Sequence, residues 1–174
     1  MKKLLLAATT FLLSLNAWAG SIYLGPTIFE QTNTSYNDNY RGLHPRLSIG
    51  YWDAIDCFYL AAEGFIVPLT VTMSESNPTR PESVRTTYSW GASFLPGLLL
   101  TETIVAYLRV GYTATRFWGP DATKSGGQFG AGLQSDLTEN WSLRGEYLYT
   151  AYSNISYLSP HTDQFGIGLI YKLQ

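Results

Sequence analysis

The chain has 174 residues, a formal net charge of −2 and 45% hydrophobic residues. This length is that of one domain, and a slightly acidic chain without Lys/Arg runs excludes a nucleic-acid-binding surface. The single cysteine, Cys57, excludes an intramolecular disulfide and a thiolate metal site. We expect Cys57 to be a small buried or lipid-facing residue at the start of a strand, and we expect no cofactor.

The first nineteen residues have the organisation of an export signal. Met1-Lys2-Lys3 is basic, the segment from Leu4 to Leu15 is apolar, and Ala17-Trp18-Ala19 has the small-x-small pattern that signal peptidase cleaves. The apolar stretch is too short for a membrane-spanning helix, which needs roughly 18 apolar residues. We therefore predict a signal peptide at residues 1–19 and one domain at residues 20–174.

The remaining chain alternates strand-like segments with polar connections. We predict eight strands: Ser21–Gln31, Leu43–Trp52, Phe58–Val71, Thr86–Leu99, Ile104–Phe117, Gly127–Leu137, Trp141–Tyr149 and Asp163–Leu173. Three connections are short, at 53–56, 101–103 and 138–140. Four are long and rich in Asn, Ser, Thr, Pro and Tyr, at 32–42, 72–85, 118–126 and 150–162. Short turns at one end and long loops at the other are typical of an outer-membrane barrel with its loops outside the cell. The predicted fold is all-β, an eight-stranded antiparallel transmembrane β-barrel.

The strands have one bulky face and one small or charged face. In the last strand, Phe165, Ile167 and Leu169 alternate with Gly166 and Gly168, and this period of two separates two environments. The outward face is expected to carry Leu47, Ile49, Leu60, Leu108, Val110, Leu143 and Ile167. A soluble barrel would place its apolar face inside. The interior of eight strands holds little more than small side chains, however, so the bulky face is expected to point outward into lipid.

Several segments alternate small or polar residues with aliphatic and aromatic ones: Ile22-Tyr-Leu-Gly25, Arg46-Leu-Ser-Ile-Gly-Tyr51, Tyr59-Leu-Ala-Ala-Glu63, Ala106-Tyr-Leu-Arg-Val-Gly-Tyr112, Gly130-Ala-Gly-Leu-Gln134, Leu137-Thr-Glu-Asn-Trp141 and Ser142-Leu-Arg-Gly-Glu-Tyr147. In these segments, and over essentially its whole length after the leader, the chain resembles the small eight-stranded outer-membrane barrels of the OmpA/OmpX type. The resemblance implies an outer-membrane location, contact with membrane lipid and lipopolysaccharide, and recognition of the C-terminal strand by the barrel-assembly machinery. Such barrels usually end on an aromatic residue, whereas this chain ends Tyr171-Lys-Leu-Gln174.

Six charged residues fall on the small-residue face: Arg46, Glu63, Arg109, Arg144, Glu146 and Lys172. A Lys or Arg that faced lipid at the midplane would cost roughly 2–4 kcal/mol. We therefore expect these side chains to form a salt-bridge network inside the barrel, with Arg109 and Arg46 as candidate partners of Glu63. The alternative is a small charged pore or proton path, for which an eight-stranded interior has little room.

Catalytic and metal-binding patterns are weak. Lipid A deacylases of this size carry a His-x-Ser motif, and neither His44 nor His161 has a serine two residues later. Two histidines and scattered carboxylates also lack metal-ligand spacing. The sequence predicts a non-enzymatic protein, with a lipid A acyl hydrolase or acyltransferase as an alternative.

Aromatic residues divide into two groups. Tyr51, Trp90, Tyr112, Trp141, Tyr147, Tyr149 and Tyr171 are expected to form the interfacial girdles of the barrel. Tyr36, Tyr40, Trp118, Tyr152 and Tyr157 are expected in or near the long loops. Tyrosine beside Asn and Ser is typical of adaptable recognition surfaces. The leading hypothesis is a barrel that presents four surface loops for adhesion or contact with a host-surface ligand.

Overall fold

The computed structural model describes residues 20–35, 38–69, 71–75, 83–117, 123–152 and 161–173. These residues form strands joined by turns, and none of the described segments is a helix long and apolar enough to cross a membrane. The strands are β1 (Ser21–Ser35), β2 (Asp38–Ile55), β3 (Phe58–Val67), β4 (Val71–Glu75), β5 (Ser83–Leu99), β6 (Ile104–Phe117), β7 (Thr123–Asp136), β8 (Trp141–Tyr152) and β9 (His161–Leu173).

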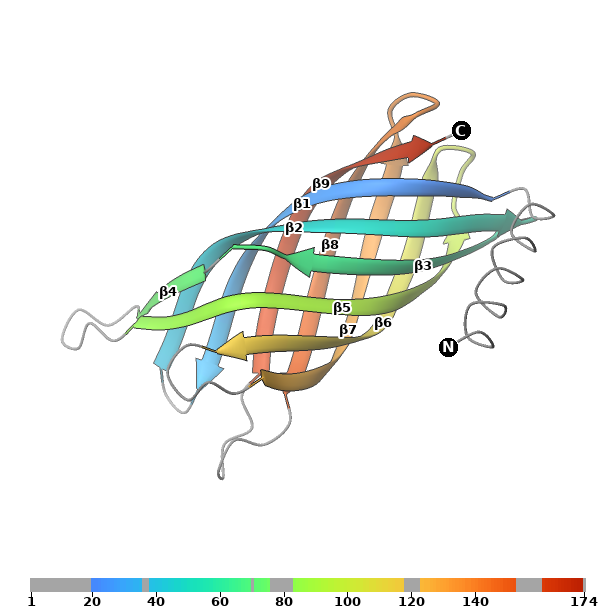
Figure 1. Ribbon diagram of the computed structural model, residues 1–174. Helices are drawn as coiled ribbons and strands as arrows, with labels where there is room; N and C mark the ends of the chain where they lie inside the picture. Colours follow the sequence, from blue (N-terminus) through green and yellow to red (C-terminus); the bar gives the residue numbers. More distant parts are fainter. Residues whose placement is uncertain are drawn as a thin grey trace, which may run out of the picture.

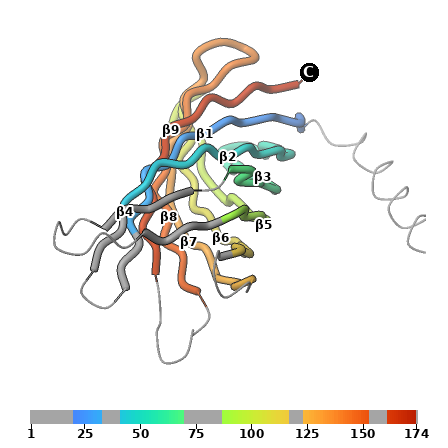
Figure 2. The backbone as a smooth tube through the Cα atoms, turned by 60° about the vertical axis from the view of Figure 1, so that its left-hand side comes forward, coloured from blue at the N-terminus to red at the C-terminus, as the bar shows by residue number. Residues whose placement is uncertain are grey.

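The strands form one closed antiparallel sheet. Strands that follow one another in the chain are paired, except β3 and β4, and β1 pairs with both β2 and β9, so the sheet has no free edge between its first and last strands. β1 and β9 run side by side in both views (Figure 1) (Figure 2). The predicted eight-stranded antiparallel barrel is confirmed, because β3 and β4 occupy one position in it and both pair with β2 and β5.

The strands extend further than predicted at the end of the barrel where the long connections lie, here called the loop end. β1 continues to Ser35 and β2 begins at Asp38, within a segment that was predicted as a loop. The third predicted strand is divided after Val67, where Pro68 lacks the N–H needed for a ladder hydrogen bond. Hydrogen bonding between neighbouring strands thus keeps the residues at 32–35 and 38–42 in strands, although their polar composition is typical of turns.

The opposite end, here called the turn end, has connections at 56–57, 100–103 and 137–140. In the first of these, Asp56 has a φ of 55°, a left-handed conformation that Asp tolerates better than most residues. Cys57 lies in this turn and is exposed. Of the two alternatives, a buried or a lipid-facing residue at the start of a strand, the buried one was wrong, and Cys57 lies one residue before the start of β3.

The register assigns the two faces as the alternation predicted. Paired residues in neighbouring strands point to the same side, for example Leu108 opposite Ala131 and Ala131 opposite Tyr147. All seven residues predicted on the outer face are exposed: Leu47, Ile49, Leu60, Leu108, Val110, Leu143 and Ile167. Their inward-facing neighbours along each strand are buried or glycine. The bulky face is thus the outside of the barrel.

Small residues on the inner face make room for large ones. A Cβ atom at Gly91 would lie 2.2 Å from the carbonyl oxygen of Tyr112 and 2.6 Å from the ring of Phe65. At Gly50, a Cβ atom would lie 2.3 Å from the ring of Tyr23. The narrow interior is filled because each large inward ring has a glycine opposite it.

The interior is divided into three layers along the barrel axis. The layer nearest the turn end is apolar and aromatic, with Tyr23, Tyr59, Ala61, Leu95, Tyr107 and Ile170 packed together. The middle layer contains the buried charges Glu63, Arg109, Arg144 and Glu146. The layer nearest the loop end is polar and contains Arg46 together with Gln31, Thr113, Thr115, Gln128, Thr150, Thr162 and Gln164.

A pair of Gly→Ala substitutions tests this packing. A Cβ atom at Gly145 meets nothing within 4 Å, so Gly145→Ala should leave the barrel unchanged or stabilise it by up to about 1 kcal/mol through reduced chain entropy. Gly91→Ala should destabilise it by about 1–3 kcal/mol because the methyl group overlaps the ring of Phe65 and a backbone carbonyl. Urea unfolding in lipid vesicles measures both, and equal effects would contradict the assigned faces.

Candidate functional site

Glu63 is the centre of the buried charge layer. Its Oε1 atom is 2.7 Å from Nη1 of Arg109, and its Oε2 atom is 2.6 Å from Nη1 of Arg144. The Tyr23 hydroxyl donates a further hydrogen bond of 2.8 Å to Oε2. β3 supplies Glu63, while β6 and β8 supply the arginines, so the carboxylate links strands across the interior rather than neighbours in the sheet.

A second carboxylate completes the group around Arg109. Glu146 accepts a hydrogen bond of 3.0 Å from Nε of Arg109 and lies 2.9 Å from its Nη2. The Tyr107 hydroxyl donates to the same Glu146 oxygen at 3.2 Å. The side chains of Arg109, Glu63 and Glu146 are at most 2% exposed. Each carboxylate therefore has cationic and phenolic donors in place of water.

Arg144 is held by an amide as well as by Glu63. Its Nε and Nη2 atoms donate to Oε1 of Gln134 at 3.2 and 2.9 Å. The guanidinium also lies over two rings, 5.1 Å from the centroid of Tyr23 and 5.4 Å from that of Tyr107. Cation–π contacts of this kind add to the stability of a desolvated arginine.

The other two predicted cations lie apart from this group. Lys172 pairs at 2.6 Å with Asp136, a residue that sequence reasoning missed although it alternates in phase with inward-facing Gln134. Arg46 contacts Gln164 at 3.1 Å and lies between the rings of Phe29 and Phe65. The structure therefore brings Arg109 to Glu63 but does not bring Arg46 to it, and Arg144 takes the second position instead.

The two histidines lie on opposite sides of the barrel wall. His44, on β2, is buried inside the barrel and stacks on Phe29 with ring centroids 5.5 Å apart. His161 begins β9 on the outer face and stacks on Tyr149 at 5.7 Å. Near it, the Tyr147 hydroxyl donates a hydrogen bond to Asp163. Among the described residues no group of three His, Cys, Asp or Glu side chains could hold a metal ion.

The predicted loop aromatics are only partly within the described residues. Tyr36, Trp118 and Tyr157 lie outside them, and Tyr40 lies in β2 with its backbone opposite Asn33 and Glu75. Tyr152 was predicted in a loop, and this was wrong. It is the last residue of β8, and its hydroxyl lies inside the barrel, 3.2 Å from that of Thr115. The strand continues past Tyr149 because β7 extends to pair with it.

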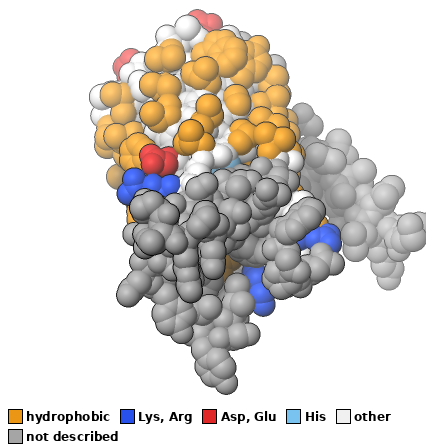
Figure 3. All heavy atoms as spheres, turned by 90° about the vertical axis from the view of Figure 1, so that its left-hand side faces the viewer, with side chains coloured by type: hydrophobic (Ala, Val, Ile, Leu, Met, Phe, Trp, Pro, Cys, Tyr) orange, Lys and Arg blue, Asp and Glu red, His pale blue; other side chains and the backbone are white. Residues whose placement is uncertain are grey.

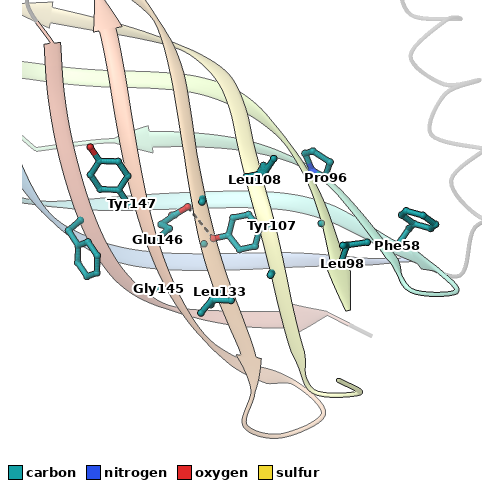
Figure 4. A pocket seen from close by; sticks show the side chains of 14 residues that line it. Phe58, Pro96, Leu98, Tyr107, Leu108, Leu133, Gly145, Glu146 and Tyr147 are labelled. Atoms are coloured by element: carbon teal, nitrogen blue, oxygen red, sulfur yellow. Dashed lines mark hydrogen bonds between the residues drawn. The ribbon is translucent and has the colours of Figure 1, made fainter. Parts of the chain in front are cut away.

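The outer wall carries a shallow apolar depression of about 830 Å³ over β5 to β8. The small residues Ala106, Ala131 and Gly145 line it. The larger side chains of Leu98, Leu108, Leu133 and Tyr147 line it as well (Figure 4). Hydrophobic side chains also cover much of the barrel wall that is visible in Figure 3. Exposed charged residues of the outer surface lie toward its ends, Glu30 and Arg41 at the loop end and Glu102 and Glu139 at the turn end. The band between them has the chemistry of a hydrocarbon-facing surface.

The family model of the outer membrane protein beta-barrel domain matches residues 5–172, which is nearly the whole chain. The chain belongs to this family. Its location is the outer membrane, and the apolar band is the part that contacts lipid, as members of this family span the membrane by strands. A search of curated protein sequences finds no match.

Solved structures with the same fold have different roles. Neisserial surface protein A superposes with a TM-score of 0.57 and 19% identity, over 89% of this chain and 99% of that one. Ail, the attachment invasion locus protein of Yersinia pestis, solved with the heparin analogue sucrose octasulfate, gives 0.54 and 13%, over 87% and 99%. The outer membrane enzyme PagL gives 0.50 and 12%, over 84% and 99%. Barrels of this fold thus include an attachment invasion locus protein and an enzyme, and these similarities establish the fold alone.

The buried ion pairs should be energetically coupled. Glu63→Gln leaves Arg144 without a carboxylate in a desolvated layer and should destabilise the barrel by about 3–5 kcal/mol. Adding Arg144→Met removes the stranded charge, so the double variant should recover about 0.5–3 kcal/mol relative to additivity. Urea unfolding of the four proteins in lipid vesicles gives the coupling energy. As a control, Glu63→Gln combined with Lys172→Met should be additive, because Lys172 pairs with Asp136; coupling in the control alone would contradict the assigned contacts.

The cost of a charge on the outer wall should depend on its depth. Leu108 is 60% exposed and lies beside the charged middle layer, whereas Ile55 is 55% exposed at the turn end of β2. Leu108→Arg should destabilise the folded barrel by about 2–4 kcal/mol, and Ile55→Arg by at most about 1 kcal/mol. Folding into vesicles of defined lipid measures both. Equal costs would show that the band around Leu108 does not face hydrocarbon.

Proposed function

We propose that this protein is a non-enzymatic outer-membrane barrel whose function is carried by the four connections at its loop end, through adhesion or contact with a host-surface ligand. The observation that carries the proposal is the filled interior. Three large inward-facing side chains, Arg109, Arg144 and Leu148, are each at most 1% exposed, so little open space remains around them. A wall that faces lipid and a centre that is closed leave the loop end as the surface for specific recognition.

The buried charges act, in this proposal, as an internal support for the barrel rather than as a path for ions. Both carboxylates of the middle layer are bonded by arginine and tyrosine donors, so transport of an ion would require these contacts to break. A barrel that keeps its shape holds the ends of its strands at fixed positions. Fixed anchor points lower the entropy that the connections lose when they bind a partner.

The composition of the connections supports recognition. Residues 76–82 read Ser-Asn-Pro-Thr-Arg-Pro-Glu, and residues 153–160 read Ser-Asn-Ile-Ser-Tyr-Leu-Ser-Pro. Together with Tyr36, Tyr40 and Trp118, they combine aromatic rings with small polar residues, a composition common in adaptable binding surfaces. Tyr152 is excluded from this set because its side chain lies inside the barrel. The likeness of fold to Ail makes a sulfated glycan one ligand class to test.

Two further parts of the proposal concern export and assembly. Residues 1–19 are a signal peptide that is removed, which leaves residues 20–174 as the mature barrel. β9 closes the barrel against β1 and is the strand that the barrel-assembly machinery reads. The loop end faces outward, where it adjoins lipopolysaccharide.

Loop replacement on the cell surface tests the proposed function. Replacing residues 153–160 by a Gly/Ser segment of equal length should reduce binding of expressing cells to host cells or to immobilised heparin at least tenfold, with equal surface amounts. The control is the same kind of replacement at the turn end, residues 137–140, which should leave binding unchanged. Conductance steps of the purified barrel in planar bilayers, or altered lipid A on its expression, would instead support a pore or a lipid A-modifying enzyme.

A further inference from the structure

The buried charges of the middle layer and of the adjoining loop-end layer do not balance. Three arginines, Arg46, Arg109 and Arg144, are buried in these two layers with two glutamates, Glu63 and Glu146. Arg109 and Arg144 make the ion pairs with the two carboxylates. Arg46 has no ion pair with any described carboxylate. Since the arginine side chain does not give up its proton in proteins, one positive charge is left over in a desolvated layer.

Arg46 packs against two aromatic rings but makes few hydrogen bonds. Its guanidinium carbon lies 4.3 Å from the ring centroid of Phe29 and 4.2 Å from that of Phe65. One nitrogen, Nη2, donates to Gln164 at 3.1 Å, and Gln164 in turn donates to Gln31. Nε and Nη1 have no hydrogen-bond partner, although Arg46 as a whole is only 3% exposed. Three of the five N–H groups of a guanidinium are therefore unused.

A small polar cavity lies next to these unused donors. It has a volume of about 20 Å³ and is lined by Arg46 together with His44, Gln128, Thr113 and Tyr152, among others. This is slightly more than the roughly 10–15 Å³ that one water-sized species occupies, so a polyatomic ligand does not fit. Two further lining atoms, Nδ1 of His44 and Oε1 of Gln128, also lack partners.

We propose that this cavity is a binding site for a small monovalent anion of the halide class, held by Arg46. An anion there would neutralise the surplus positive charge and accept hydrogen bonds from the unused N–H groups of Arg46. A neutral water molecule would accept hydrogen bonds but would not neutralise the charge. Gln128 can assist: a half-turn of its amide keeps its contact with the Thr150 hydroxyl and directs N–H groups into the cavity. The phenyl rings of Phe29 and Phe65 pack against the guanidinium but carry no hydrogen-bond acceptor of their own, so the unused N–H groups remain for the ion.

The site can be tested through anion-dependent stability, because a ligand that binds only the folded state stabilises it in proportion to the logarithm of its concentration above the dissociation constant. The mature barrel is unfolded by urea in lipid vesicles, in sodium chloride and in sodium gluconate at equal ionic strength. Gluconate is too large for the cavity, so the midpoint should rise with chloride concentration and stay constant in gluconate.

Two variants locate the effect. Arg46→Gln removes the charge and should abolish the difference between the two salts. Arg41→Gln removes an exposed arginine from the same strand and should keep it. Equal midpoints of the unmodified protein in chloride and gluconate would overturn the proposal, as would a chloride effect that persists in Arg46→Gln.

Diffraction from crystals of the unmodified barrel soaked in bromide gives a second test that does not require Arg46→Gln to fold. An anomalous peak within hydrogen-bonding distance of Nε or Nη1 of Arg46 supports the site. Water density without an anomalous signal would overturn it. A bromide peak without any chloride dependence in solution would indicate an adventitious ion only and would also overturn it.

Discussion

In hydrocarbon, every backbone N–H and C=O that lacks a protein partner costs several kcal/mol, since no water can replace it. The pairing of β1 with β9 meets this constraint by removing the two edges that an open sheet would expose. Once the sheet is closed, strand number fixes the width of the interior, and the alternation of each strand fixes which residues enter it. The interior has room for few side chains at each level. Polar side chains that enter it must therefore find their hydrogen-bond or ion-pair partners among those few.

The structure resolves this conflict by layering. Tyr59, Tyr107 and Ile170 pack near the turn end with apolar contacts, while four buried charges form one group, in which Glu63 contacts both Arg109 and Arg144. Arginine suits this position because its planar fork can pair with a carboxylate, bond an amide and lie over a ring at the same time, as Arg144 does. The arrangement links β3, β6 and β8 across the axis, which sheet hydrogen bonds alone cannot do.

The sequence was sufficient for the fold because the period of two is strong where both faces are constrained. Leu108 beside Arg109, and Ile167 between Gly166 and Gly168, leave one assignment of the faces. The strand ends were less predictable, since Asp38 to Gly42 has a turn-like composition and is held in β2 by pairing with β1. For the same reason the sequence predicts Tyr152 in or near a loop, although β8 extends to it.

The pairing of charges was predictable only in part. Alternation places six charged residues on the inner face, but the choice between Arg46, Arg109 and Arg144 as partners of Glu63 depends on the stagger of strands around the barrel. That stagger brings β6 and β8 to the level of Glu63, while Arg46 is retained by Phe29, Phe65 and Gln164. Ring contacts and amide hydrogen bonds across the interior leave no periodic trace in the sequence.

The turn that contains Cys57 gives the molecule a built-in reporter of its orientation. The chain has one thiol, and it is exposed at the turn end, beyond the lipid-facing band. A maleimide that cannot cross a bilayer will therefore react with Cys57 only from the compartment that the turn end faces. Comparing the labelling of Cys57 in intact cells with that in lysed cells therefore distinguishes the two directions in which the barrel could be inserted.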